Sequence, residues 1–250
     1  MKIALTYAYN GAKFSGSQTQ PSGLAAEDCL NAALARVGIN ERVISSSRTD
    51  KGVHALAQVS ATHCGDFWSS NLNYLLGQIN RHAAPHLLVR EIREVAEDFH
   101  PRYDARARSY RYLLCHDEQN AFLADFAYFC PRPDLDALNA TLTALKGERD
   151  FADFHKSGSD EKSTVRRLTH SCAYRATRFG ALAGDFTIIK FEANGFLRSQ
   201  VRMMVANALK IATEPSNLDS NLKYLRSNPP RTITKIPAPA CGLYLKKVIY

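Results

Sequence analysis

The sequence has no apolar run long enough to cross a membrane. Its longest apolar stretches, such as Leu75-Leu76 and Met203 to Ala206, are far shorter than the roughly 20 residues that a transmembrane helix needs. The first residues, Met1 to Thr6, lack the apolar core and the small-residue cleavage site of a secretory signal peptide. These absences predict a cytoplasmic protein that has no membrane partner.

Motifs for metals, nucleotide cofactors and common nucleophiles are also missing. None of the six cysteines forms a C-x-x-C pair, and no spacing suits a zinc site. There is no P-loop, dinucleotide fingerprint, H-E-x-x-H or G-x-S-x-G motif, and the eight histidines form no cluster at helical spacing. The sequence therefore predicts no metal, no cofactor, and reduced cysteines that pack as small hydrophobic residues.

Acidic residues are few relative to basic ones. The chain has 32 lysines and arginines against 24 aspartates and glutamates, and its net charge of +8 and pI near 9.2 favour a polyanionic partner. Between Pro101 and Tyr112 there are four arginines and only one acidic residue, Asp104, and tyrosines lie among them. This composition suits phosphate pairing and base stacking, and it equally suits a solvated strand edge with tyrosines in the core.

Hydrophobic periodicity divides the chain into two similar halves. In the first half, alternating residues predict strands over 2–9, 42–46, 57–63 and 86–95, and helical spacing predicts helices over about 24–37, ended by Gly38, and after a cap at Ser70. In the second half, strands are expected over 109–115, 164–177, 185–193 and 243–249, and helices after a cap at Asp134, around 201–209 and over 218–226.

Each half therefore reads approximately β-α-β-β-α-β, with a connector over about 98–107. This order is typical of the ferredoxin-like or RRM-like unit. We predict an α+β fold of two ferredoxin-like halves, residues 1–104 and 105–250, with mixed, mainly antiparallel sheets. Two such units joined together would leave a central cleft.

A polar loop between two predicted strands carries the densest group of functional side chains. Asp50 lies between Arg48 and Lys51, and nearby positive charge favours the ionised carboxylate. Gly52 permits a tight turn that projects Asp50. The loop is therefore a candidate catalytic site, and the alternative is an Asx-type turn whose charges face water.

A second candidate group is a pair of arginines, Arg198 and Arg202, that extends the apolar stripe of Val205 and Leu209 on a predicted helix. A guanidinium on a core-facing stripe needs a carboxylate or several carbonyls, because its unpaired burial is costly. Asp50 is an attractive partner for such a group. In the alternative, both arginines reach the surface from the start of the helix.

Six blocks of the sequence, in the same order and across nearly the whole chain, resemble the TruA family of tRNA pseudouridine synthases. Residues 48–55, R-T-D-K-G-V-H-A, resemble the catalytic signature R-T-D-x-G-V-H-A of that family. The other blocks are 9–18, 99–112, 147–154, 194–205 and 238–245. Four positions depart from the usual residues, and none removes the proposed catalytic group: Asn10, Ser47, Lys51 and Arg149.

The resemblance implies two ferredoxin-like halves around a basic cleft for tRNA, and a homodimer. It also implies isomerisation of uridines at about positions 38 to 40 of the anticodon stem-loop, by flipping the base out of its stack. By motif position, Asp50 is the catalytic aspartate and Arg48 assists the flipped-out base. Tyr110 packs against the target ring, Arg202 pairs with Asp50, and Leu243 lines the pocket. The reaction gains no atoms and involves no redox change, so it needs no cofactor.

Two alternatives stay open at this point. A family relative that modifies other tRNA positions, or other RNAs, would carry the same motifs. A non-catalytic RNA-binding module built of two RRM-like halves would share the charge and the element order. Such a module would be expected to carry an RNP-type aromatic motif, which the sequence lacks.

Overall fold

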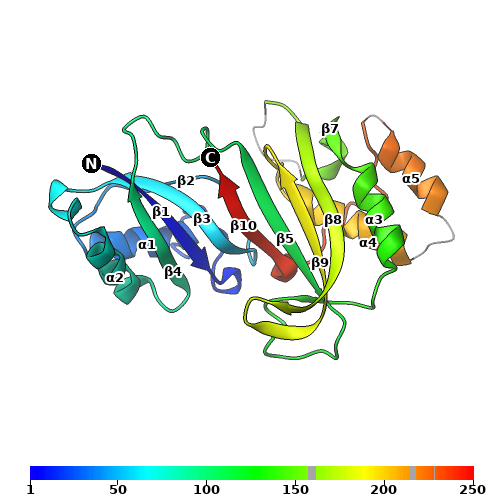
Figure 1. The fold of residues 1–250 in the computed structure, drawn as a ribbon, viewed down its shortest axis with the longest axis horizontal. Coiled ribbons are helices and arrows are strands. Elements are labelled where there is room, and N and C mark those ends of the chain that lie inside the picture. Colours follow the sequence, from blue (N-terminus) through cyan, green and yellow to red (C-terminus); the bar gives the residue numbers. More distant parts are fainter. Residues whose placement is uncertain (157–161, 214–217, 228) are drawn as a thin grey trace. The chain divides into compact units, whose positions relative to one another are not determined.

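A computed structural model describes residues 1–156, 162–213, 218–227 and 229–250, which form an α+β fold (Figure 1). The strands pair mostly antiparallel, with parallel pairing in places. The chain forms two compact units. The first unit contains Met1–Arg106 and Tyr244–Tyr250, and the second contains Ala107–Leu243. The predicted α+β class with mixed strand pairing is therefore confirmed.

The sheet of the first unit is built around a buried central strand. Its strands β1 (Lys2–Tyr9), β3 (His54–His63) and β4 (Leu87–Glu94) run in the order β4-β1-β3, and β1 is antiparallel to both neighbours. The short β2 (Ile44–Ser45) pairs antiparallel with β3. The alternating residues that predict β1 are all buried, as a half-covered strand requires: Ile3, Leu5, Tyr7 and Tyr9.

The first helix of this unit, α1 (Ala26–Ala35), ends slightly before the predicted end at residue 37, and Gly38 follows it as predicted. Gly38 adopts a φ of +82°, and the N–H of Ile39 donates to the carbonyl of Leu34 at 3.0 Å. A glycine in the left-handed conformation allows the next N–H to bond to a carbonyl of the last helical turn, which would otherwise lack a hydrogen-bond partner. The predicted role of Gly38 at the end of the helix is therefore confirmed.

The second helix, α2 (Leu72–Ala83), packs against α1 and β4, and it begins later than predicted. Asn71, not Ser70, occupies the N-cap position, and no side chain caps the helix there. The N–H of Asn71 donates to the carbonyl of Trp68, so the preceding turn continues past Ser70. The prediction of Ser70 as the cap is wrong.

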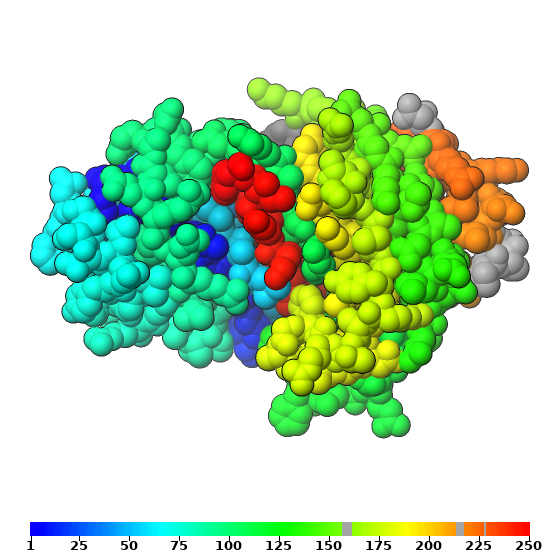
Figure 2. Space-filling view, in the orientation of Figure 1, coloured from blue at the N-terminus to red at the C-terminus, as the bar shows by residue number. Residues whose placement is uncertain are grey.

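The second unit contains a longer antiparallel sheet. Its strands β5 (Ala107–Cys115), β9 (Leu182–Ala193), β8 (Val165–Phe179) and β7 (Gly147–Asp150) follow the order β5-β9-β8-β7. The short β6 (Tyr128–Phe129) pairs in parallel with β5. In the space-filling view, β8 and β9, coloured yellow, lie open on the visible face of this unit (Figure 2).

Three helices, α3 (Leu135–Ala144), α4 (Gln200–Thr213) and α5 (Leu218–Arg226), contact one another in the second unit, and α3 packs on β8 (Figure 1). Asp134 caps α3 as predicted, because its carboxylate accepts the N–H of Ala137 at 2.7 Å. Four large aromatic side chains of this unit are fully buried: Phe151, Phe154, Phe186 and Phe191.

The start of α4 differs from the expectation for the two arginines. The helix begins at Gln200, and Ser199 before it adopts a left-handed φ of 59°. Because this residue redirects the chain, Arg198 lies outside the helix and is exposed, whereas Arg202 lies on it and is half-buried. The prediction that both arginines share one helical stripe is wrong.

The last strand, β10 (Leu243–Ile249), belongs mainly to the first unit, whereas the sequence places residues 105–250 together. The reason is a short parallel pairing with β3, in which Tyr244 lies beside His54 and Leu245 beside Ala55. The chain therefore leaves the first unit and returns to it at its end.

Candidate active site

The loop that carries Asp50 connects β2 and β3 and closes in a tight turn. The N–H of Val53 donates to the carbonyl of Asp50 at 3.1 Å, and Gly52 has a φ of +82°. A positive φ at the third position of such a turn favours glycine, which explains Gly52. Asp50 is half-buried, while Arg48 and Lys51 on either side of it are exposed. The turn therefore presents a carboxylate between two cations.

Thr49, the residue before Asp50, is fixed at three points. Its N–H donates to the Ser17 hydroxyl at 2.8 Å, and its carbonyl accepts the N–H of Ser17 at 3.2 Å. Its own hydroxyl lies 2.8 Å from the hydroxyl of Tyr9 on β1. Bonds to neighbours far apart in the sequence hold the backbone in one place, which a catalytic side chain requires.

The residues after the turn are fixed by β1 and the segment that follows it. The N–H of Gly11 donates to Nδ1 of His54 at 3.0 Å, so this nitrogen carries no proton. The ring of His54 is 2% exposed and stacks on Tyr244 with ring centroids 4.6 Å apart. The turn therefore has a rigid anchor on its second side as well.

Gln58, buried within β3, holds the beginning of the loop, and it is not among the site residues predicted from the sequence. Its amide oxygen accepts the hydroxyl of Ser46 at 2.7 Å, and its amide nitrogen donates to the carbonyl of Ser47 at 2.7 Å. The side chain is 0% exposed, so these bonds form away from water. The sequence signal for Gln58 is weak, because the same strand also carries Ser60, Thr62 and His63.

In the second unit, Tyr110 lies on β5 with its ring against the loop before α4. It is 7% exposed, and its ring meets that of Phe196 edge to face, with centroids 5.2 Å apart and planes at 88°. This is a favourable aromatic geometry. Nearby, Nη1 of Arg108 donates to the carbonyl of Asn194 at 3.0 Å, which ties the same loop to β5.

Arg202 is tied to the segment that precedes β10. Its Nε donates to the carbonyl of Ala238 at 2.7 Å, and its own carbonyl accepts the N–H of Ala238 at 3.1 Å. Such a pair of bonds fixes both the side chain and the segment. A half-buried guanidinium held at Nε presents its remaining N–H donors in a set direction.

Leu243 follows this segment and is 5% exposed. A Cβ on the preceding Gly242 would lie 2.8 Å from the ring of Tyr112, so only glycine allows the chain to pass so close. The hydroxyl of Tyr112 in turn donates to the carbonyl of Pro239 at 2.8 Å. Burial raises the pKa of Tyr112 far above its ordinary value, so it remains a neutral donor.

The cysteines carry no disulfide. Burial raises the pKa of the Cys130 thiol to about 11, and thiols of this kind are poor nucleophiles at neutral pH. Within the described ranges, no three His, Cys, Asp or Glu side chains group as metal ligands do. The described helices include none with the length and apolar character of a membrane span.

The five predicted site residues are thus divided between the units. Asp50 and Arg48 belong to the first, and Tyr110, Arg202 and Leu243 to the second. The contacts given above fix the ring of Tyr110, the side chain of Arg202 and the backbone of Asp50. The pairing of Asp50 with Arg202 stays a prediction.

Comparison with known proteins identifies the family. The chain is 38% identical to tRNA pseudouridine synthase A of Campylobacter jejuni over 250 residues, all of both chains. It is 36% and 35% identical to the proteins of that name from Helicobacter acinonychis and Helicobacter pylori, over 98% of each chain. A family model described as tRNA pseudouridine synthase matches residues 142–250.

A comparison with solved structures adds little. An RNA-bound structure of Thermus thermophilus Cse3 aligns over 85% of this chain and 97% of its own, with 13% identity. Its TM-score of 0.21 is too low for the likeness to carry an argument. The relatives that match along the whole chain decide the assignment: this chain belongs to the TruA family of tRNA pseudouridine synthases, which are isomerases.

Proposed function

We propose that the chain converts uridine to pseudouridine in the anticodon stem-loop of tRNA, at about positions 38 to 40, with Asp50 as the catalytic carboxylate on a flipped-out base. The observation that carries the proposal is the fixed turn of Asp50. Thr49 is bonded to Ser17 and Tyr9, the turn is closed by Val53, and the carboxylate between them is half-buried. An acid held in this way can act repeatedly on one atom of a bound nucleotide.

The chemistry suits a single carboxylate. The reaction breaks the bond between N1 of uracil and C1′ of ribose, turns the base, and joins C5 to C1′. The proton of C5 is lost and N1 gains one, so atoms and electrons balance without a co-reactant. A carboxylate stabilises or attacks a sugar carbon with oxocarbenium character, as in retaining glycosidases. Attack on C6 and removal of a sugar proton are the other routes open to Asp50.

The proposal gives each of the other site residues a role that is compatible with its position. Arg48 is exposed next to Asp50, where it can brace the site that the flipped base leaves. Tyr110 and Leu243, both nearly buried, offer an aromatic and an aliphatic surface for the uracil ring. Arg202, held at Nε by Ala238, is the proposed partner that keeps Asp50 charged and directed.

We also propose that the chain consists of two ferredoxin-like halves, residues 1–104 and 105–250, joined around a basic cleft. The support in the first unit is the order β4-β1-β3, with β2 on the outer edge of β3 and all these pairs antiparallel. In the second unit, β5, β9 and β8 follow one another in the matching antiparallel order. A homodimer in the cytoplasm completes the proposal, with tRNA as its substrate.

The test is Asp50→Asn, which preserves size and removes the charge. Purified variant and wild type are incubated with unmodified tRNA transcripts, and pseudouridines are mapped at single-nucleotide resolution. We expect the wild type to modify positions in the anticodon stem-loop, and the variant to bind tRNA but form no pseudouridine. An active Asp50→Asn enzyme would refute the catalytic assignment. Products at other positions would refute the assignment of the substrate site alone, and tRNA binding by a wild type that forms no product would favour a binding module.

A further inference from the structure

We propose that the turn over residues 99–106 is a second contact for tRNA, in which the exposed ring of Tyr103 stacks on an unpaired nucleobase. The neighbouring arginines would hold phosphates of the same strand. The inference rests on the proposed function, because it takes tRNA as the ligand. It adds a stacking surface in the first unit that no site residue named above provides.

The turn is closed by its own hydrogen bonds. The N–H of His100 donates to the carboxylate of Asp104 at 2.8 Å, and the N–H of Asp104 returns to the carbonyl of His100 at 3.0 Å. Nδ1 of His100 also accepts the N–H groups of Arg102 and Tyr103, both at 3.2 Å. Four bonds within five residues leave this backbone little freedom, so a ligand need not order it.

Tyr103 projects from this turn with one face supported. Its ring lies 4.2 Å from that of His100, with 31° between the planes, and the residue is nonetheless 78% exposed. Leaving a large aromatic in water forgoes the stabilisation that its burial would provide. A ring that packs against another ring, tilted by 31°, and is otherwise exposed has the form of a base-stacking platform.

The base of the turn is tied to the end of the chain. The hydroxyl of Tyr250 donates to the carbonyl of Pro101 at 2.9 Å, and its ring lies 5.1 Å from that of Phe99. The N–H of Arg106 donates to the carbonyl of Ile249 at 2.8 Å. The turn is therefore bonded to the end of β10 within the first unit, and a base stacked on Tyr103 would be held close to that strand.

The charge around Tyr103 favours a nucleic acid over a protein surface. Arg102 and Arg106 are exposed on either side, and the guanidinium of Arg93 lies 5.8 Å over the ring of Phe99. The negative charge of Asp104, in the same turn, is partly satisfied because its carboxylate accepts the backbone N–H of His100. Aromatic rings alternating with arginines suit a strand whose bases stack and whose phosphates need cations.

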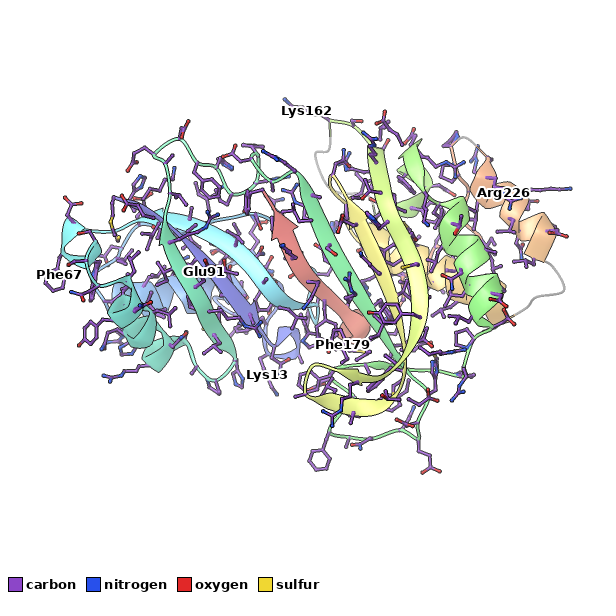
Figure 3. All side chains as sticks on the ribbon, viewed as in Figure 1. Lys13, Phe67, Glu91, Lys162, Phe179 and Arg226 are labelled. Atoms are coloured by element: carbon purple, nitrogen blue, oxygen red, sulfur yellow. The ribbon has the colours of Figure 1, made fainter. Side chains whose placement is uncertain are left out.

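The first experiment measures equilibrium binding of an unmodified tRNA transcript to full-length Tyr103→Ser, Tyr103→Phe and wild type. We expect Tyr103→Ser to bind on the order of tenfold to a hundredfold more weakly, and Tyr103→Phe to bind nearly as wild type, because the ring is what stacks. The salt dependence of binding should stay unchanged, since no phosphate contact is lost. The matched control is Phe67→Ser, which removes a 79% exposed ring at the edge of the same unit (Figure 3).

Full affinity of Tyr103→Ser would overturn the inference, as would an equal loss in Phe67→Ser. If sedimentation shows that Tyr103→Ser instead breaks a dimer, the ring belongs to an interface between copies and the inference is wrong.

A second measurement does not depend on affinity. In a Trp68→Phe background, which removes the single native tryptophan, the indole introduced by Tyr103→Trp should lose fluorescence when tRNA binds. Unchanged fluorescence on binding counts against stacking. Pseudouridine mapping tests Asp50 separately, so the two proposals can fail independently.

Discussion

Gly11 lies directly against the carbonyl group of Val53, and a Cβ atom on Gly11 would be 2.1 Å from the oxygen of Val53. The same glycine donates its N–H to His54. The segment after β1 therefore touches the turn of Asp50 along its backbone, at a separation that no other residue permits. This contact therefore limits which residues can stand at position 11 beside the turn.

We expect Gly11→Ala to displace the turn and to lower activity strongly. The added methyl group requires a shift of backbone atoms, and such overpacking typically costs about 1–3 kcal/mol of folding free energy. The measurements are pseudouridine formation and the free energy of unfolding in denaturant. Gly77→Ala in α2 is the control, because its Cβ would meet no atom within 4 Å. Because alanine favours a helix more than glycine does, Gly77→Ala should stabilise the protein by about 1 kcal/mol or less and leave activity unchanged. Normal activity in Gly11→Ala would show that the contact does not hold the turn.

Gln58→Leu should lower kcat for pseudouridine formation by about tenfold or more, while tRNA binding changes little. The leucine leaves the Ser46 hydroxyl and the Ser47 carbonyl without their bonds to the amide, and each lost buried bond costs about 1–3 kcal/mol. Because Gln58 is 0% exposed, it acts through the loop and does not touch the substrate. Gln78→Leu, on a half-buried position of α2, is the control. A variant that binds weakly but turns over normally once saturated would argue against a positioning role.

Much of the element order could be predicted from periodicity, because strands such as β1 and helices such as α5 have clear apolar patterns between turn residues. The predicted ranges for α5 and β10 agree with the structure to the residue. Ser70 and Arg198 were misplaced because helix starts depend on the turn before them, here the bond of Asn71 to Trp68 and the left-handed Ser199. Periodicity carries no information on either.

The candidate loop was found from its charges and its resemblance, but its supports were not. Ser17, Tyr9 and Gln58 reach the loop from positions far apart in the sequence, so the partners depend on strand register. Register is settled by the packed sheet and by residues such as Gly11, whose role appears only when its neighbours are known. A single sequence does not carry these pairings.

Arg149 replaces the histidine that is usual in the family, and its contacts predict a structural role. Its guanidinium donates to the carbonyls of Ala144, Leu225 and Arg226 at 2.6, 2.7 and 2.9 Å, at the ends of α3 and α5. The last carbonyls of a helix lack partners and carry partial negative charge, so a cation there is stabilising. We expect Arg149→Met to reduce the free energy of unfolding by about 1–3 kcal/mol. Lys146→Met, at an exposed position nearby, should change it much less, and equal effects would contradict a capping role.

The first unit should lose stability as pH rises through the pKa of His63. One ring nitrogen of His63 lies 2.9 Å from the carboxylate of Glu41, and the other lies 2.9 Å from that of Glu97. Bonds to Glu41 and then to Glu97 raise the pKa of His63 above its ordinary value of 6.5. A group whose pKa is raised by folding stabilises the fold below its unfolded pKa and loses that contribution as pH rises through the folded one. All three side chains are well exposed, so the effect is modest and screened by salt.

We expect the difference in Tm between wild type and His63→Gln to be largest at about pH 6 and to vanish by about pH 9. Glu41→Gln should remove part of the same pH dependence, because Glu97 remains. If the difference in Tm is constant across this range, the imidazole is not charged in the folded protein.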